Sequence, residues 1–420
     1  MTLPPATTKG VGIGAAAMLA VLVWAFALSN AFRTLPTIIA SGIGADFALG
    51  TQQLGLFAAL FHISFAGMQM PVGVALDRVG PRRCVAALSV VAAVGALIVG
   101  VAQSYLVASI GQVLIGVGCA PALMGAMVFI ARHYPQEQFA RISGVVLAAG
   151  GLGMLLTATP LAWLVEHGSW RMAFWLLGAL SASAAVLCWL LVDDRTTDDA
   201  QAAGDKPRET LMAAMRGLGR VLREPQTPGI LALALVTFAS ALTLRGLWIV
   251  PLFTQRYGMS LVQAGNLALW VSLAMIMGPM IFGWLDPGPK RRRRVIVAAA
   301  LTSAVLIAIL AIGTGSAALD AGLAVAFGGT TAYFVLQYAD VRTFYPAPLV
   351  GRALSAVNLS VFLGVSLLQF GTGVLAAAAL RHGLDVQVVV LASLAAALAA
   401  GACVFVVLAP DRAGDKRSPS

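Results

Sequence analysis

Two arginines lie within the most apolar stretches of this sequence. Arg33 falls in the apolar run 12–41 and Arg245 in the apolar run 229–256, and neither run contains an aspartate or a glutamate. A guanidinium at the depth of a lipid bilayer costs roughly 2.5–3.5 kcal/mol on insertion scales, so it needs a polar cavity or a partner. Because its planar fork suits carboxylate or phosphate, the pair predicts a site for an anion that comes from outside the protein.

Helical spacing gives each arginine polar or aromatic neighbours. Asn30 and Thr37 share one helical face with Arg33, and Trp248 lies one turn beyond Arg245. An amide, a hydroxyl and an aromatic ring beside a guanidinium suit an anion with an organic body. The alternative is that the arginines extend towards the membrane interface and that Trp248 only packs between helices or in an interfacial belt.

Other apolar runs also carry polar side chains at helical spacing. We predict that they complete the binding site: Tyr333, Gln337, Asn358 and Gln369. The alternative is that they only join neighbouring helices by hydrogen bonds, worth about 0.6 kcal/mol each on average. His62 is the one histidine inside an apolar run, and because histidine titrates near physiological pH it is a candidate for proton coupling.

The composition requires a membrane to position these residues. With 60% hydrophobic and 10% charged residues, the chain of 420 residues has too little polar surface for a soluble globule. Its apolar runs are long enough for helices that cross a bilayer, so we expect an all-α fold. The predicted spans are 12–41, 51–74, 84–102, 105–131, 138–165, 172–192, 229–256, 260–284, 295–313, 318–340, 351–380 and 386–409.

The basic residues set the orientation of these spans. The net charge is +10, and 22 of the 27 lysines and arginines fall in alternate loops and at the two termini. The positive-inside rule places those segments, and therefore both termini, in the cytoplasm. An even number of spans is then required. The first run is too long for a signal peptide, so we expect it to remain as the first span of a multi-pass protein of the inner (plasma) membrane.

Little in the sequence indicates an enzyme. The four cysteines show no paired spacing, so they predict neither disulfides nor a metal site. No hydrolytic or redox constellation is found, and no cofactor or nucleic acid is expected. The predicted partners are the lipid bilayer, a small and anionic substrate, and a coupling proton or counter-anion. We expect the chain to act as a monomer.

The two halves of the sequence repeat. Pro71 through Arg83 and Pro279 through Arg291 share a Pro, Gly, Asp and basic pattern, and Tyr134-Pro135 matches Tyr345-Pro346 at an offset of 211. This predicts a bundle of six helices at 1–192, a cytoplasmic linker at 193–228, a second bundle at 229–409 and a cytoplasmic tail at 410–420. In such parallel repeats the substrate site lies near the midplane, between the repeats.

The motif Gly73-x-x-x-Asp77-Arg78-x-Gly80-x-Arg82-Arg83 resembles the signature loop of the major facilitator superfamily. The resemblance covers the whole chain, because a second copy of the loop stands at Asp286. It implies two pseudo-symmetric bundles of six helices and alternating access by rocking of these halves. An arginine on each of the first and seventh spans also resembles the organophosphate/phosphate antiporters of that family, although little else matches them.

The same resemblance implies a cytoplasmic gate. In the family the loop aspartate meets the start of the eleventh span, where Arg352 stands here, and pseudo-symmetry makes Arg141 the candidate partner of Asp286. Such pairs would hold the outward-open state. We therefore assign the gate, separately from the substrate site, to six residues: Asp77, Arg78, Arg82, Arg141, Asp286 and Arg352.

Departures from the family narrow the function. Gln112 stands where many proton-coupled members carry an arginine on the fourth span, and the fifth-span Gly-Pro signature of drug/proton antiporters is missing. The 17 acidic residues fall in loops or at span ends, whereas exporters of cationic drugs usually need a carboxylate in the membrane. The sequence thus predicts a secondary transporter of a small organic anion. The alternatives are a proton-coupled multidrug or metabolite exporter and a transport-like solute sensor.

Overall fold

The computed structural model describes residues 13–193, 219–345 and 347–408. Every regular element in these ranges is a helix. Twelve helical segments are long and apolar enough to cross a membrane, from Gly14–Thr34 to Val386–Leu408. The predicted all-α fold with twelve spans is confirmed. Most of the predicted linker 193–228 and the predicted tail 410–420 lie outside the described residues.

The first six spans are built from nine helices. Their bounds are α1 Ile13–Thr34, α2 Pro36–Asp46, α3 Thr51–Val101, α4 Tyr105–Cys119, α5 Pro121–His133, α6 Gln136–Gly151, α7 Gly153–Leu156, α8 Thr159–Glu166 and α9 Trp170–Leu191. The last six spans follow the same plan. Their bounds are α12 Thr227–Thr243, η1 Leu244–Trp248, α13 Ile249–Tyr257, α14 Leu261–Trp284, α15 Pro289–Ile312, α16 Ala317–Thr330, η2 Thr331–Tyr333, α17 Phe334–Phe344, α18 Ala347–Arg381 and α19 Val386–Leu408.

Several of the predicted spans differ from single, separate helices. The second and third spans run through one helix, α3, which turns at Gly80 with φ 81° and ψ 165°. Glycine adopts such a φ without steric cost, so the connection needs no longer loop. The fifth span was predicted as one helix at 138–165 and is divided into α6, α7 and α8. Pro160 in the first turn of α8 lacks the N–H that would continue the preceding helix.

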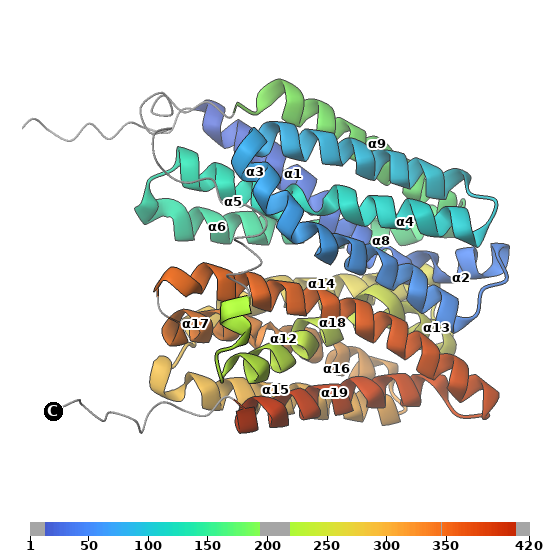
Figure 1. Cartoon of the computed structure of the whole chain (residues 1–420). Helices are drawn as coiled ribbons and strands as arrows, with labels where there is room; N and C mark the ends of the chain where they lie inside the picture. The colour runs from blue at the N-terminus through green and yellow to red at the C-terminus, as the bar shows by residue number, and fades with distance from the viewer. Residues whose placement is uncertain (1–12, 194–218, 346, 409–420) are drawn as a thin grey trace, which may run out of the picture.

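The helices form two layers, with α1–α9 in one and α12–α19 in the other (Figure 1). The layers approach closely at the end of the molecule that carries Arg171 and Arg381, which we call the outer end. A Cβ atom on Gly55 of α3 would lie 2.6 Å from the carbonyl oxygen of Gln369 in α18. A Cβ on Gly265 of α14 would lie 2.9 Å from that of Ala162 in α8. Glycine thus permits backbone contact between the halves here.

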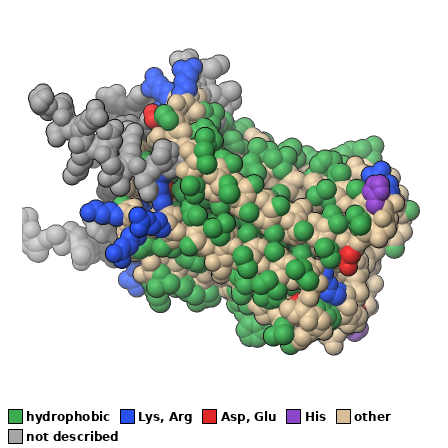
Figure 2. Space-filling view, turned by 90° about the horizontal axis from the view of Figure 1, so that it is seen from below, with side chains coloured by type: hydrophobic (Ala, Val, Ile, Leu, Met, Phe, Trp, Pro, Cys, Tyr) green, Lys and Arg blue, Asp and Glu red, His purple; other side chains and the backbone are tan. Residues whose placement is uncertain are grey.

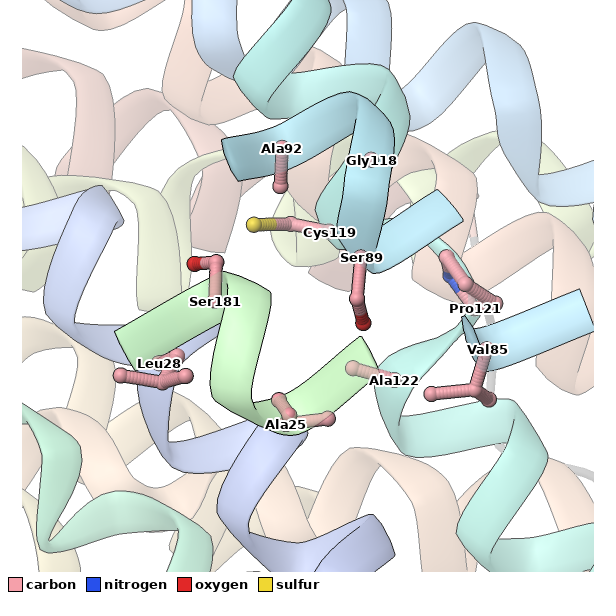
Figure 3. A pocket seen from close by; sticks show the side chains of 11 residues that line it. Ala25, Leu28, Val85, Ser89, Ala92, Gly118, Cys119, Pro121, Ala122 and Ser181 are labelled. Carbon is pink, nitrogen blue, oxygen red and sulfur yellow. The ribbon is translucent and has the colours of Figure 1, made fainter. Parts of the chain in front are cut away.

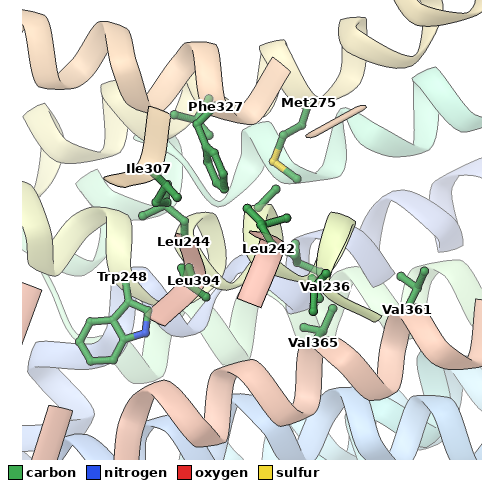
Figure 4. Packing of buried hydrophobic residues seen from close by; sticks show 14 of the residues in the cluster. Val236, Leu242, Leu244, Trp248, Met275, Ile307, Phe327, Val361, Val365 and Leu394 are labelled. Atoms are coloured by element: carbon green, nitrogen blue, oxygen red, sulfur yellow. The ribbon is translucent and has the colours of Figure 1, made fainter. Parts of the chain in front are cut away.

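Each half has its own hydrophobic core, and the cores meet at the interface. Figure 4 shows the core of the second half around α12, with Leu242 and Leu244 pointing among side chains of neighbouring helices. Ile38 and Met154 of the first half pack in that same cluster. Phe362 of α18 packs in the core of the first half. The interface between the halves is therefore largely apolar, and the polar groups inside it need a separate explanation.

The outside of the molecule matches a lipid environment. Figure 2 shows hydrophobic side chains over the middle of the surface and many lysine and arginine side chains gathered at one end of the molecule. Large apolar side chains are widely exposed, with Trp284 at 84% and Leu106 at 69%. At the outer end, Arg171 pairs with Asp46, which also accepts a hydrogen bond from Trp170 Nε1. The hydrogen bonds from Arg171 and Trp170 hold the pKa of the Asp46 carboxyl below its usual range.

The charge distribution makes a testable prediction about orientation. In a Cys403→Ser background, Arg291→Cys should react with a membrane-impermeant maleimide only from the cytoplasmic side, and His382→Cys only from outside, because basic loops stay in the cytoplasm. Both positions are exposed, and the three other native cysteines are buried. Labelling of intact cells compared with inverted vesicles measures this. Reaction of position 291 in intact cells would overturn the topology.

Candidate functional site

Arg33 of α1 lies buried between aromatic rings from both halves. Its side chain is 5% exposed, and its guanidinium carbon lies 4.5 Å from the centroid of the Phe65 ring and 4.8 Å from that of Phe362. Nη1 donates to Asn30 Oδ1 at 3.3 Å and Nη2 to Ser29 Oγ at 3.4 Å. The predicted neighbour Asn30 thus orients the guanidinium from one turn below. Aromatic faces attract a cation, but they do not neutralise it.

Arg245 of η1 is completely buried and reaches across the interface. Nε donates to Ser272 Oγ of its own half at 2.7 Å. Nη2 donates to the carbonyl oxygen of Met154 at 3.0 Å and to Thr157 Oγ1 at 3.4 Å, both in the first half. Interfacial snorkelling, the alternative weighed for the arginines, would leave the head group exposed, and this side chain is 0% exposed.

The two arginines share an electrostatic deficit. Among the described residues, no carboxylate forms an ion pair with Arg33 or Arg245. Each also keeps one N–H group with no partner in the protein, Nε of Arg33 and Nη1 of Arg245. Burying a charge without an opposite charge destabilises the fold by roughly several kcal/mol. Buried hydrogen-bond donors normally have an acceptor. The site is therefore suited to hold an anion between the halves.

Both arginines stand where their span is irregular. α1 ends at Thr34 and α2 begins at Pro36, so the break between these helices comes just after Arg33. In the seventh span, η1 is a π-helix that contains both Arg245 and Trp248. Pseudo-symmetric positions thus carry a break and a π turn, and π turns inside α-helices are frequent at functional sites. Thr157, which accepts from Arg245, hydrogen-bonds Thr34 of α1, so a short polar chain joins the two irregular segments.

Gln369 and His62 form a second group of unsatisfied polar atoms beside Arg33. Both side chains are 0% exposed. Nδ1 of His62 contacts the carbonyl oxygen of Ala58 at 3.3 Å, whereas its Nε2 and both amide atoms of Gln369 have no hydrogen-bond partner. Gln369 lies beside Gly246 and the backbone of Arg33, and His62 lies one turn from Phe65, whose ring faces the Arg33 guanidinium. The structure brings these three predicted residues together. Proton coupling by His62 remains a prediction.

Thr37 and Trp248 lie at a different level, in the wall of a cavity towards the outer end. The cavity has a volume of about 260 Å³. Trp248 Nε1 donates to Thr372 Oγ1 at 2.9 Å, and Thr37 Oγ1 accepts from the backbone N–H of Val250 at 3.4 Å. The lining comes from both halves: Thr37, Ala40, Ser41, Thr51, Leu54, Leu247, Trp248, Val250, Pro251, Thr254, Gln255 and Leu261. Arg33 and Arg245 do not line it.

Three predicted ligands instead bond within the second half. Thr237 Oγ1 lies 2.9 Å from the Tyr333 hydroxyl and accepts from Gln337 Nε2 at 2.8 Å. Asn358 Oδ1 accepts from the Tyr338 hydroxyl at 3.3 Å. These contacts match the alternative that such residues join helices. Gln337 Oε1 has no partner, so a substrate role for that residue is still a prediction.

A second cavity lies inside the first half (Figure 3). Ser89, Cys119 and Ser181 point towards it, and its volume is about 10 Å³. A space of that size holds about one water molecule, whereas sites for organic ligands are larger by an order of magnitude. This cavity is therefore too small to be the substrate site.

The predicted gate residues lie at the end of the molecule opposite the outer end. Arg82 Nε donates to the carbonyl oxygen of Trp189 at 2.9 Å and its guanidinium lies over that ring, which ties the loop to the end of α9. Arg78 is exposed. The side chain of Asp77 lies outside the described residues. A latch between Asp77 and Arg352 therefore remains a prediction.

Asp286 has a partner that the sequence analysis missed. Arg292 of α15 donates from Nε to Oδ1 at 3.0 Å and from Nη2 to Oδ2 at 2.6 Å. The hydrogen bonds from Arg292 hold the pKa of this carboxyl below its usual range. Arg141, the partner inferred from pseudo-symmetry, is exposed and does not bond Asp286 in this structure. A pair with Arg141 remains a prediction for the outward-open state.

Some residues that hold the arginines were not predicted from the sequence. Ser272 and Thr157 stand in apolar runs with no polar residue one turn away that would have drawn attention to them. Phe65 follows His62 by three residues and therefore lies on the same face of the second span. This spacing was the one sequence signal that could have identified Phe65.

Comparison with known proteins decides the family. The model of the Major Facilitator Superfamily matches residues 13–368. This chain belongs to the major facilitator superfamily. A solved bacterial homologue of the human lysosomal transporter Spinster, in an inward-facing conformation, superimposes with a TM-score of 0.71 at 19% identity, covering 95% of this chain and 96% of that one. Membership makes the protein a multi-pass membrane transporter and not an enzyme, as the sequence predicted.

Curated relatives in this superfamily include carriers of organic anions. The chain is 25% identical over 250 residues to "Probable sulfoacetate transporter SauU" of Cupriavidus necator, covering 58% of this chain. It spans only 57% of the length of that relative. It is 24% identical over 282 residues to the hexuronate transporter of Escherichia coli, with 64% of each chain covered.

Proposed function

We propose that this superfamily member moves a small organic anion across the cytoplasmic membrane by alternating access, and that Arg33 and Arg245 bind the anion. One observation carries the proposal. Two guanidinia are buried where the halves meet, each with an unsatisfied N–H, and no described carboxylate pairs with them. Their charges are compensated if the substrate itself is the counter-ion.

The sign of the substrate follows from electrostatics. An organic cation would meet two like charges at low dielectric with no described carboxylate beside them, which is unfavourable. An anion would instead accept charge-assisted hydrogen bonds from Arg33 Nε and Arg245 Nη1, the two donors without a partner. This argues against the alternative of an exporter for cationic drugs.

The residues around Arg33 and the volume of the outer cavity indicate the size and the apolar part of the substrate. Phe65 and Phe362 cover the guanidinium of Arg33, and these apolar faces suit carbon atoms next to the charged group. The cavity at the outer end offers about 260 Å³, slightly below the range of about 300–1,000 Å³ for drug-sized ligands. Relatives named for sulfoacetate and hexuronate fit this class of small organic anion.

The route is inferred from the position of the outer cavity. Trp248 lines this cavity and lies one helical turn from Arg245 in the same π-helix. We infer that Trp248, held by Thr372, separates the outer cavity from the arginines, and that rocking of the halves moves this barrier. A substrate would then pass from the cavity to the arginines without meeting water from both sides.

A thermal-shift screen tests the proposal. Purified protein should be stabilised by at least one of sulfoacetate, glucuronate, succinate or malate, because a ligand that binds only the folded state at 100 times its Kd adds about 2.7 kcal/mol. Potassium chloride at equal ionic strength is the control. Stabilisation by tetraphenylphosphonium but by none of the anions would refute an anion site and favour a cation exporter.

A further inference from the structure

We infer that the substrate is a hydroxylated organic anion, with a hydroxyl group held between Gln369 and His62. The inference rests on the proposed anion site and adds a substrate class to it. It comes from polar atoms beside Arg33 that a carboxylate bound by the two arginines would leave unsatisfied.

The amide of Gln369 is the clearest of these groups. The side chain is 0% exposed, and neither Nε2 nor Oε1 has a hydrogen-bond partner. The neighbouring backbone leaves room for it, since a Cβ on Gly246 would lie 3.4 Å from Nε2 and 3.1 Å from the carbonyl oxygen of Arg33. A buried amide without hydrogen bonds destabilises the protein, because it has lost its bonds to water and gained none in return. Such a group in a native protein needs an explanation, and binding of a ligand is one.

His62 supplies the second half of the site. Its imidazole Nε2 is buried without a partner, while Nδ1 is placed against the carbonyl oxygen of Ala58. Gln369 of α18 is close enough to His62 to act on it electrostatically. By hydrogen-bond geometry, neither Nε2 of His62 nor the Gln369 amide has a partner. A group that both donates and accepts could bond to the two at once. A hydroxyl does both, whereas an ionised carboxylate only accepts.

The positions of these groups relative to the arginines define the ligand. Arg33 lies on α1, His62 on α3 and Gln369 on α18, so side chains from both halves contribute to the group, and Gly246 of η1 leaves room beside Gln369. The guanidinium of Arg33 lies 4.5 Å from the centroid of the Phe65 ring, and Phe65 lies one helical turn from His62 on α3. The hydroxyl therefore belongs close to the anionic group, as in a 2-hydroxy acid or a sugar acid. Sulfoacetate carries no hydroxyl, and we expect it to bind less tightly than hydroxylated anions.

Malate and succinate provide a matched test. They carry the same charge and chain and differ by one hydroxyl. By isothermal titration calorimetry, one enantiomer of malate should bind the wild-type protein at least about tenfold more tightly than succinate, because succinate leaves Gln369 and His62 unsatisfied. In Gln369→Leu the ratio of the malate and succinate affinities should fall to about twofold or less. Gln387→Leu, a buried glutamine bonded to Gln255 at the outer end, should keep the preference.

Each outcome has a distinct meaning. Equal affinity of succinate and both malate enantiomers for the wild type would overturn the hydroxyl inference and leave the anion site standing. Retention of the tenfold preference by Gln369→Leu would also overturn it. Binding of none of the anions by the wild type would overturn the proposed function together with the inference. The wild-type comparison decides the matter even if the leucine variant fails to fold.

Discussion

Transport of the bound anion should fall at least about tenfold when either Arg33 or Arg245 is replaced by lysine, although both variants keep their charge. Arg245 donates to Ser272 and Met154 through two nitrogens of its planar guanidinium, and its Nη1 remains available for a ligand. The ammonium group of a lysine cannot reproduce this arrangement. One hydrogen bond to a charged group contributes roughly 1.5–3 kcal/mol, which corresponds to tenfold or more. Uptake into proteoliposomes, with the anion that binds best in the thermal-shift screen, measures the effect.

The control is Arg381→Lys at the exposed outer end, which should transport normally. If the arginines served only to reach the interface, lysine would do so as well and transport would survive. Near wild-type transport by Arg33→Lys or Arg245→Lys would thus remove that arginine from the site.

The double variant separates one shared site from two independent ones. If both guanidinia bind the same anion, Arg33→Lys combined with Arg245→Lys should be little worse than either single change, since groups that act as a unit are not additive. Two independent roles would instead multiply the losses, to about a hundredfold or more if each single loss is about tenfold.

The burial of the arginines could be predicted from the sequence, but their partners could not. A charge in a long apolar run must lie inside the membrane region, so Arg33 and Arg245 were identified from local pattern alone. Ser272 and Thr157 come from other spans, and local pattern does not determine which side chains meet when helices pack. The π turn at Leu244–Trp248 likewise leaves no mark in an apolar sequence.

Helical spacing predicted which residues share a helix face more reliably than it predicted which residues of other helices they contact. Tyr333 and Gln337 do share one face, as their spacing of four indicated, but that face meets Thr237 inside the second half. Pseudo-symmetry similarly pointed Asp286 towards Arg141, whereas the carboxylate bonds Arg292, six residues away. A partner six residues away along the chain closes a much shorter loop than a partner in the other half, so the pairing costs less conformational entropy.

Gly55→Leu should abolish transport by holding the outer end open. The α3 and α18 backbones touch here. A Cβ added to Gly55 would lie 2.6 Å from the backbone carbonyl oxygen of Gln369 and 3.0 Å from Gly373 Cα. These atoms belong to backbone that cannot rotate away, so the helices must separate. Because superfamily members work by rocking of their halves, a side chain at this contact blocks the states in which the outer end is closed.

The separation can be measured next to the outer cavity. Ala40 lines that cavity and is 8% exposed, so Ala40→Cys should react slowly with an impermeant maleimide and several-fold faster when Gly55→Leu is added. Gly67→Leu is the matched control on the same helix, since a Cβ there meets nothing within 4 Å, and it should leave both labelling and transport unchanged. Unfolding temperatures of the two leucine variants show whether both are folded. Normal transport by a folded Gly55→Leu protein, or unchanged labelling at position 40, would mean that this contact does not open during transport.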